Sequence, residues 1–203
     1  MLRVHRIPHS TNVERVALAA ALKHLEVHWV DHDAADRSGL VAVSGQRLAP
    51  VAELPDGRVV SDSPAILREL EALAPDPPLW PREPVARAQA DIFVEWFNEV
   101  WKGPPNRIAD GAGTAADAAA LRTWCARFED LLADGRPYLL GPELTVADIV
   151  AAPFAAYFGA PLPPGDDDPF HRVLAALPRG ERTAAWVARV RGAAAEAGAA
   201  ARG

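Results

Sequence analysis

The chain has 203 residues, of which 50% are apolar and 24% are charged, and its formal net charge is −6. This length allows one large domain or two small ones. The acidic balance argues against a nucleic-acid partner, which needs a basic surface. No stretch approaches the roughly 18 consecutive apolar residues of a membrane span, so we expect no membrane partner. The single cysteine, Cys125, excludes an intramolecular disulfide, and the start of the chain lacks a secretory signal, so a cytoplasmic protein is expected.

The first 75 residues alternate between strand-like and helix-like patterns. Four short apolar or alternating segments predict strands: residues 2–7, 27–30, 50–54 and 58–60. Two segments have apolar residues at helical spacing: residues 12–24 and 63–73. The stretch 34–48 is polar and irregular, and Pro55-Asp56-Gly57 is typical of a hairpin turn. We therefore predict an α/β domain over residues 1–75, with the order βαβ and then ββα.

The second part of the chain loses the strand signals. Four prolines between positions 74 and 81 predict a linker, which we place at residues 76–83. Four later segments show helical periodicity: 83–102, 115–133, 146–158 and 181–192. The alanine-rich tail from Ala193 to Gly203 contains nothing that demands burial, so we expect it to fray. Residues 84–203 are thus predicted to form an all-α domain.

The segment from Pro8 to Arg15 joins the first predicted strand to the first predicted helix. Ser10 lies where that helix begins. A hydroxyl beside the unpaired N–H groups of a helix start can hold an anion. Serine is also a favoured helix cap, so Ser10 has a purely structural alternative. Arg15, one turn later, either adds positive potential at the same place or is a solvated helix residue.

Two later segments could also bind a ligand. Pro50 opens the third strand, and a cis bond after Ala49 would expose nearby backbone groups; the local sequence leaves cis or trans open. Asp62 and Ser63 precede a helix that has Pro64 in its first turn. Ser63 could bind a carboxylate and Asp62 an ammonium group, although simple capping explains both residues as well.

Together these segments resemble the glutathione S-transferase superfamily. Residues 1–75 resemble its thioredoxin-like glutathione-binding domain, and the segment from Pro8 to Arg15 resembles the active-site segment of the serine-type enzymes, especially the phi-like and related bacterial classes. Ala49-Pro50-Val51 stands where the family has its cis-proline, and Asp62-Ser63-Pro64-Ala65-Ile66 is similar to the family's Glu/Gln-Ser-x-Ala-Ile motif. Leu144 to Ile149 resembles the capping motif of the helical domain.

The resemblance implies a detoxifying glutathione transferase that uses glutathione as co-substrate, takes a hydrophobic electrophile, needs no metal and forms a homodimer. Ser10 would donate a hydrogen bond to the thiolate. The implied thiol-binding residues are Ala49, Pro50, Val51, Asp62 and Ser63, with Asn12, Arg15, Gln46 and Arg47 as weaker candidates. The implied electrophile pocket contains Pro8, His9, Trp96 and Trp101. Trp96, Phe97 and Trp101 stand at helical spacing, so a core role is an equal alternative.

Two alternatives remain beside this function. Asp62 is shorter than the family's usual Glu or Gln, and residues 45–50 do not follow its Gly-x-Val-Pro pattern, so the thiol could differ from glutathione. A binding or interaction protein that kept the fold without catalysis is the second alternative, because fold does not fix function.

Other residues of chemical interest have simpler explanations. Cys125 stands inside a predicted helix and is expected to be a buried structural thiol. Thr145 and Asp148 have the spacing of a capping box, which assigns them to folding. Three histidines recur every four residues, but the chain changes from helix to strand among them, so we expect no metal site; they are His24, His28 and His32. The run of aspartates at 166–168 is expected to be a solvated loop.

Overall fold

The structure is a computed structural model that describes residues 1–200, and these form two compact units. The first unit comprises residues 1–79 together with 191–200, and the second comprises residues 80–190. Residues 191–200 thus group with the first unit, although they follow the second unit in the sequence.

The first unit contains a mixed four-stranded sheet in the order β2-β1-β3-β4. The strands are β1 (Leu2–Arg6), β2 (Val27–Asp31), β3 (Val51–Glu53) and β4 (Val59–Ser61). β1 and β2 are parallel, whereas the β1/β3 and β3/β4 pairs are antiparallel. A parallel pair needs a crossover connection, which helix α1 (Thr11–Leu22) supplies.

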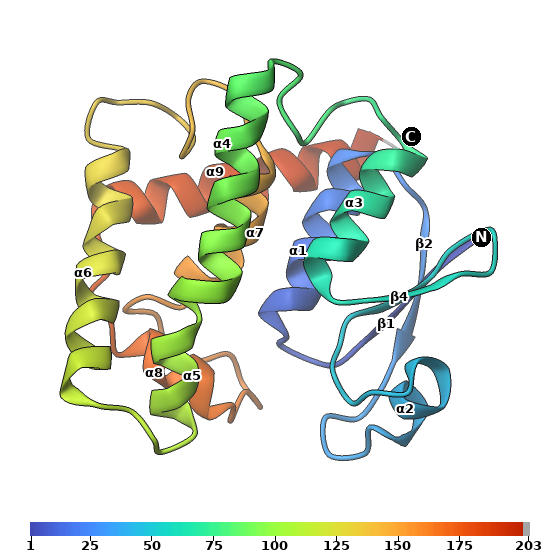
Figure 1. Cartoon of the computed structure of the whole chain (residues 1–203), viewed down its shortest axis with the longest axis horizontal. Coiled ribbons are helices and arrows are strands. Elements are labelled where there is room, and N and C mark those ends of the chain that lie inside the picture. Colours follow the sequence, from blue (N-terminus) through green and yellow to red (C-terminus); the bar gives the residue numbers. More distant parts are fainter. Residues whose placement is uncertain (201–203) are drawn as a thin grey trace. The chain divides into compact units, whose positions relative to one another are not determined.

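Two helices of this unit lie side by side, α1 and α3 (Ser63–Leu73), and α3 packs against β3 and β4 (Figure 1). The apolar residues that predicted α3 are fully buried: Ile66, Leu67 and Leu70. A third helix, α2 (Ser38–Ser44), lies in the stretch expected to be irregular. Only Leu40 of α2 is buried, so the sequence has no repeating apolar stripe to reveal it. The resulting βαβαββα order confirms the expected thioredoxin-like domain.

The second unit is helical, as predicted. Its helices are α4 (Pro84–Glu95), the π-helical η1 (Trp96–Trp101), α5 (Gly103–Ala109), α6 (Ala115–Leu131), α7 (Val146–Ala155), α8 (Pro169–Ala175) and the beginning of α9 (Glu181–Ala200). Aromatic rings form its core: Phe97, Trp101, Phe128, Phe154, Phe158 and Trp186. Across residues 1–200, no helix is both long enough and apolar enough to cross a membrane.

The start of α7 confirms the folding role assigned to Thr145 and Asp148. The two residues form a reciprocal capping box, in which the Asp148 carboxylate accepts from the Thr145 N–H at 2.9 Å and from its hydroxyl at 3.2 Å. The carboxylate also accepts from Leu139 N–H and from the indole of Trp186, each at 2.9 Å. Burial raises the pKa of Asp148, and these hydrogen bonds oppose that rise.

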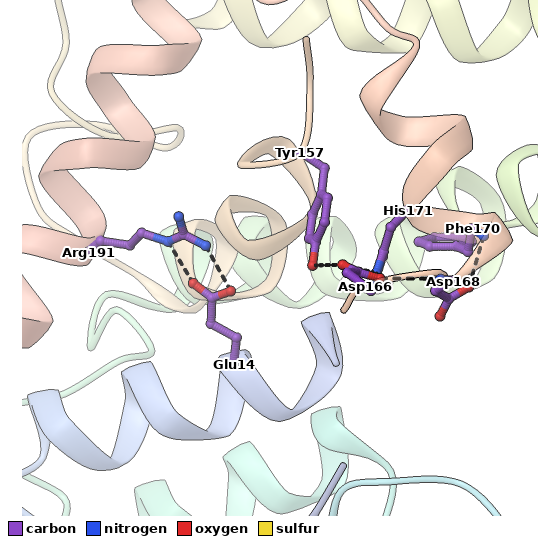
Figure 2. Close-up of polar contacts among 7 residues, drawn as sticks. All are labelled: Glu14, Tyr157, Asp166, Asp168, Phe170, His171 and Arg191. Carbon is purple, nitrogen blue, oxygen red and sulfur yellow. Dashed lines mark hydrogen bonds and ion pairs between the residues drawn. The ribbon is translucent and has the colours of Figure 1, made fainter. Parts of the chain in front are cut away.

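Two expectations about loops and ends are wrong. The tail does not fray over residues 193–200, because α9 continues to Ala200; its last three residues lie outside the described part. Arg191 holds this segment on α1 with hydrogen bonds to both Glu14 carboxylate oxygens, at 2.7 and 2.9 Å (Figure 2). In the run 166–168, Asp167 and Asp168 are exposed as expected, but Asp166 is buried. Asp166 accepts from the Tyr157 hydroxyl at 2.8 Å and pairs with His171 Nδ1 at 2.8 Å (Figure 2).

Candidate functional site

Ser10 is the N-cap of α1, and its hydroxyl oxygen accepts a hydrogen bond from Val13 N–H at 3.3 Å. Ser10 therefore does cap α1, which is the structural role that the sequence left open. A hydroxyl can accept and donate at the same time, so capping leaves the Ser10 O–H able to donate to an anion. The side chain is half-buried, and the preceding residues Pro8 and His9 are exposed. His9 has a φ of 58°, an uncommon conformation outside glycine, at the turn that leads into Ser10.

Arg15 is fully buried, which excludes a solvated helix residue. Its guanidinium donates to Ser63 Oγ and to Asn12 Oδ1, each at 3.1 Å, and these two oxygens are 3.3 Å apart. Burial lowers the pKa of Arg15 to about 9, against the opposing charge of Asp62. The side chain therefore remains cationic at neutral pH. It joins the helix that begins after Ser10 to the helix that begins at Ser63.

The Asp62–Ser63 segment has an unusual backbone. Asp62 has a φ of 75°, and its side chain makes no capping hydrogen bond to α3. The capping alternative for Asp62 therefore has no contact to support it. Ser63 is completely buried, whereas Asp62 is exposed. A buried hydroxyl at a helix start beside an exposed carboxylate can bind a ligand that carries both a carboxylate and an ammonium group.

The peptide bond between Ala49 and Pro50 is cis, which answers the question that the local sequence left open. The next residue, Val51, lies in β3, paired with His5 of β1 on one side and with Ser61 of β4 on the other. Val51 is fully buried, so only its main chain is a candidate for ligand contact.

The two candidates for a second ligand carboxylate differ in the structure. The Gln46 side-chain amide donates to the Leu48 carbonyl at 2.8 Å and accepts from the Leu48 N–H. Its polar atoms thus brace the segment that precedes the cis bond. Arg47 is exposed, and its charge acts on the nearby carboxylate of Asp36. Of the two side chains, Arg47 is the better placed to meet a ligand.

The two tryptophans proposed for the electrophile pocket belong to η1 in the second unit and have different environments. Trp101 is fully buried and stacks on Phe97 with ring centroids 4.5 Å apart, which is the core role left open by the sequence. Trp96 is half-buried and meets the ring of Trp124 edge-on, at 6.0 Å between centroids. Only Trp96 therefore keeps surface that a substrate could touch.

Cys125 is 4% exposed, and burial raises the pKa of its thiol to about 12. A thiol with this pKa stays protonated at neutral pH and is a poor nucleophile, as expected of a structural residue. Within residues 1–200, no group of three or more His, Cys, Asp and Glu side chains is arranged to hold a metal ion.

Sequence reasoning missed one polar cluster beside these residues. His5 is hydrogen-bonded to both His32 and Glu53, although the three residues come from separate segments. The sequence held one sign that His5 is buried and needs a polar partner. His5 lies in a strand with Leu2 and Val4, which are core residues.

Two family models match the chain. Residues 9–73 match "Glutathione S-transferase, N-terminal domain" and residues 93–189 match "Glutathione S-transferase, C-terminal domain". Among curated proteins, the chain is 30% identical over 156 residues to a probable maleylacetoacetate isomerase 1 of Drosophila melanogaster, a match that spans 68% of this chain and 61% of that protein. A probable maleylacetoacetate isomerase of Caenorhabditis elegans is 34% identical over 80 residues, which is 37% of this chain and 36% of the relative. The chain thus matches less than two thirds of either isomerase.

Solved structures show the same fold over nearly the whole chain. A glutathione S-transferase from Rhodospirillum rubrum F11 is 25% identical, with a TM-score of 0.68 over 94% of this chain and 88% of that one. A glutathione transferase from Methylococcus capsulatus is 18% identical, with a TM-score of 0.77 over 100% and 99% of the two chains. A theta class enzyme from Xanthomonas axonopodis, solved with glutathione bound, is 21% identical, with a TM-score of 0.68 over 97% and 96%.

Proposed function

Because the chain belongs to the glutathione S-transferase superfamily, we propose that it binds glutathione, or a similar small thiol, and activates the thiol for attack on an electrophile. One observation carries this proposal. Buried Arg15 donates to Ser63 and lies on the helix that Ser10 caps, so one cation connects the two candidate anion sites of the first unit.

The first step of the proposed mechanism is formation of the thiolate. A free thiol has a pKa near 8.5 and is mostly protonated at neutral pH. Ser10 donates its O–H to the sulfur, and the N-terminus of α1 adds its partial positive charge. Lowering the thiol pKa by one unit requires about 1.4 kcal/mol of preference for the thiolate. A hydrogen bond to a charged group contributes about 1.5–3 kcal/mol, so Ser10 and the helix terminus together can lower the pKa of the thiol by about one to two.

The second part of the mechanism is orientation of the thiol. In the proposed binding mode, the buried hydroxyl of Ser63 and the N-terminus of α3 hold the α-carboxylate of a γ-glutamyl group. The exposed carboxylate of Asp62 pairs with the ammonium group of the same ligand. The main chain at Ala49 and Val51, on either side of the cis-proline, pairs with the peptide backbone of the thiol. These contacts fix the sulfur near Ser10 and thereby lower the entropic cost of the reaction.

Conjugation is the first candidate reaction. The thiolate sulfur forms a bond to the electrophilic carbon, the leaving group departs with its electron pair, and the thiol proton passes to solvent. One thiol is consumed in each turnover.

Thiol-catalysed isomerisation is a second candidate, favoured by the 30% identity to a probable maleylacetoacetate isomerase. Here the thiolate adds to one carbon of a conjugated double bond, and the resulting single bond rotates. Elimination then breaks the carbon–sulfur bond and regenerates the thiolate. No thiol is consumed, so the concentration of free glutathione separates this reaction from conjugation.

Three variants of Ser10 test the proposal with the purified protein, glutathione and a chlorinated nitrobenzene. Ser10→Ala removes the donor and the cap, Ser10→Asp keeps a capping oxygen but places a negative charge beside the sulfur, and Ser10→Thr keeps both functions. We expect conjugation to fall about tenfold or more in the Ala and Asp variants, because each loses a charge-assisted hydrogen bond. The pH–rate profile of both should shift to higher pH, whereas Ser10→Thr should retain most of the rate.

Two outcomes would contradict the proposal. A folded Ser10→Asp variant with an unchanged rate would remove Ser10 from the mechanism. Failure of the unmodified protein to bind glutathione or other cellular thiols in a calorimetric screen would favour the non-catalytic alternative.

A further inference from the structure

Three titratable side chains form a hydrogen-bonded row in the first unit, outside the proposed thiol-binding residues. His5 Nδ1 of β1 lies 2.8 Å from Nε2 of His32, the residue after β2. His5 Nε2 lies 2.8 Å from Oε1 of Glu53 in β3. His5 is only 3% exposed, and the two imidazole rings stack with centroids 5.1 Å apart. The proposed mechanism uses none of these groups.

The row limits how many protons the two imidazoles can hold. With His5 Nε2–H donating to the carboxylate, His5 Nδ1 accepts from His32 Nε2–H, and His32 Nδ1 carries no proton. One further proton can bind at His32 Nδ1 without disturbing the contact. A second further proton has to enter at His5 Nδ1, where it would face the His32 N–H across 2.8 Å. The closed pair therefore holds one extra proton, whereas two separated imidazoles hold two.

Charged groups lie on both sides of the row. Arg3 lies 3.2 Å from Glu53, and the hydrogen bond from His5 holds the pKa of Glu53 below its usual range. On the other side of the row, Asp31 and Asp36 act on His32; Asp31 is itself paired with Arg6, and Asp36 lies near Arg47. Hydrogen bonds from Arg6 and Ser38 lower the pKa values of Asp31 and Asp36, respectively. Helix α2 has no titratable side chain.

His32 also supports helix α2. A methyl group at position 39 would lie 2.7 Å from both Cε1 and Nδ1 of His32, so the α2 backbone passes directly over the imidazole edge. Leu40 is the only buried residue of this seven-residue helix. The chain then continues through Gln46 and Arg47 to the cis-proline. Movement of the His32 ring would therefore remove a contact with the α2 backbone.

We propose that the His5–His32 pair acts as a pH-dependent latch. The hydrogen bond between the two rings holds α2 and the segment that follows it, residues 45–51, in place at neutral pH, and its loss on acidification releases both. The effect on thiol binding rests on the proposed function; the effect on α2 does not. The open pair has room for one more proton than the closed pair, because separation frees His5 Nδ1. Acidification therefore favours opening, by at most about tenfold for each pH unit.

The test combines amide hydrogen exchange of α2 with calorimetric glutathione affinity, measured from pH 8 to pH 5. His32→Gln places an amide N–H near the position of Nε2, so it can donate to His5 without taking up a proton. His28→Gln is the matched control, because His28 is exposed on β2, the strand that precedes His32. We expect α2 protection and thiol affinity to fall on acidification in the unmodified protein and in His28→Gln, and to stay nearly level in His32→Gln.

Two results would overturn the latch: level α2 protection in the unmodified protein, or the same decline in His32→Gln. If His32→Gln does not fold, Gly39→Ala provides the second test, because its methyl group displaces the ring and should reduce α2 protection already at pH 8. Unchanged protection in Gly39→Ala would also contradict the latch. If the unmodified protein binds no thiol at pH 8, the proposed function fails. Hydrogen exchange of α2 still tests whether the His5–His32 pair releases the helix on acidification.

Discussion

Arg15 donates a hydrogen bond to the hydroxyl of Ser63 at 3.1 Å, although the two residues are 48 positions apart in the sequence. A guanidinium group has no acceptor, so Ser63 Oγ must accept here. The Ser63 proton is thereby directed elsewhere, either to Asn12 Oδ1 at 3.3 Å or to a bound anion. The contact with Arg15 thus leaves the O–H of Ser63 as the group that can be donated to a ligand.

Replacement of Arg15 by methionine should weaken thiol binding more than it weakens the fold. Met fills a similar volume, and it removes the free-energy cost of burying a charge, which offsets part of the lost hydrogen bonding. We expect KM for glutathione to rise about tenfold or more, the size of a lost charge-assisted hydrogen bond, while kcat changes little. Steady-state kinetics with varied glutathione measures both constants.

Lys23→Met is the matched control for this variant. Lys23 is also a buried cation at the end of α1, and it binds Glu71 at 2.6 Å and the Ala74 carbonyl at 2.6 Å, away from Ser63. This control should lose stability and keep its KM. An equal rise of KM in both variants would reduce Arg15 to a purely structural residue.

Loss of the cap at the start of α7 should destabilise the second unit. Thr145→Ala removes the capping hydroxyl and one of the hydrogen bonds to buried Asp148. We expect the free energy of unfolding in urea to fall by about 1–2 kcal/mol. Thr123→Ala is the control, since the Thr123 hydroxyl donates to the Ala119 carbonyl on an exposed part of α6. Its effect should be close to zero, and a loss equal to that of Thr145→Ala would contradict the capping role.

Asp166 should contribute stability that depends on pH. Burial opposes its ionisation, but hydrogen bonds from His171 and Tyr157 outweigh burial and hold the pKa of Asp166 below its usual range. A lowered carboxyl pKa in the folded state stabilises the fold above the unfolded value of about 3.9, and this contribution disappears as the pH falls through the folded value.

The variant Asp166→Asn should therefore be less stable at pH 7 by about 1.5–3 kcal/mol, the range of a charged hydrogen bond. The difference from the unmodified protein should stay constant down to roughly pH 4 and narrow below it. Urea unfolding at several pH values measures the difference. Asp167→Asn, at an exposed neighbouring position, should show no such pattern. A difference that does not narrow in acid would show that shape rather than charge matters at Asp166.

Cys125 should resist alkylation in the folded protein. Burial raises the pKa of its thiol to about 12, so almost no thiolate is present at pH 8. Iodoacetamide should modify Cys125 slowly in buffer and rapidly in denaturant, as followed by mass spectrometry. Cys125→Ala should retain thiol-transfer activity. Rapid labelling in buffer, or loss of activity in a folded variant, would assign the cysteine a chemical role.

Periodicity predicted much of the fold, because the spacing of apolar residues is a property of neighbouring residues. The period-two segment at 2–7 became β1, and the helical stripe at 63–73 became α3 with its apolar side chains fully buried. The short helices escaped prediction: α2, α5 and α8. Helices of seven residues present too few apolar positions for a periodic stripe to appear.

The candidate residues Ser10, Pro50 and Ser63 could be selected from the sequence because turns, prolines and helix starts have local signatures. Their environments could not. Those environments depend on segments that packing brings together. Arg15 is buried against Ser63, Asp166 accepts from the Tyr157 hydroxyl, and His5 contacts His32. The sequence by itself determined the order of the elements and the chemical groups available. The tertiary structure decided which groups share a proton or a charge, because burial and hydrogen bonding depend on neighbours in space rather than along the chain.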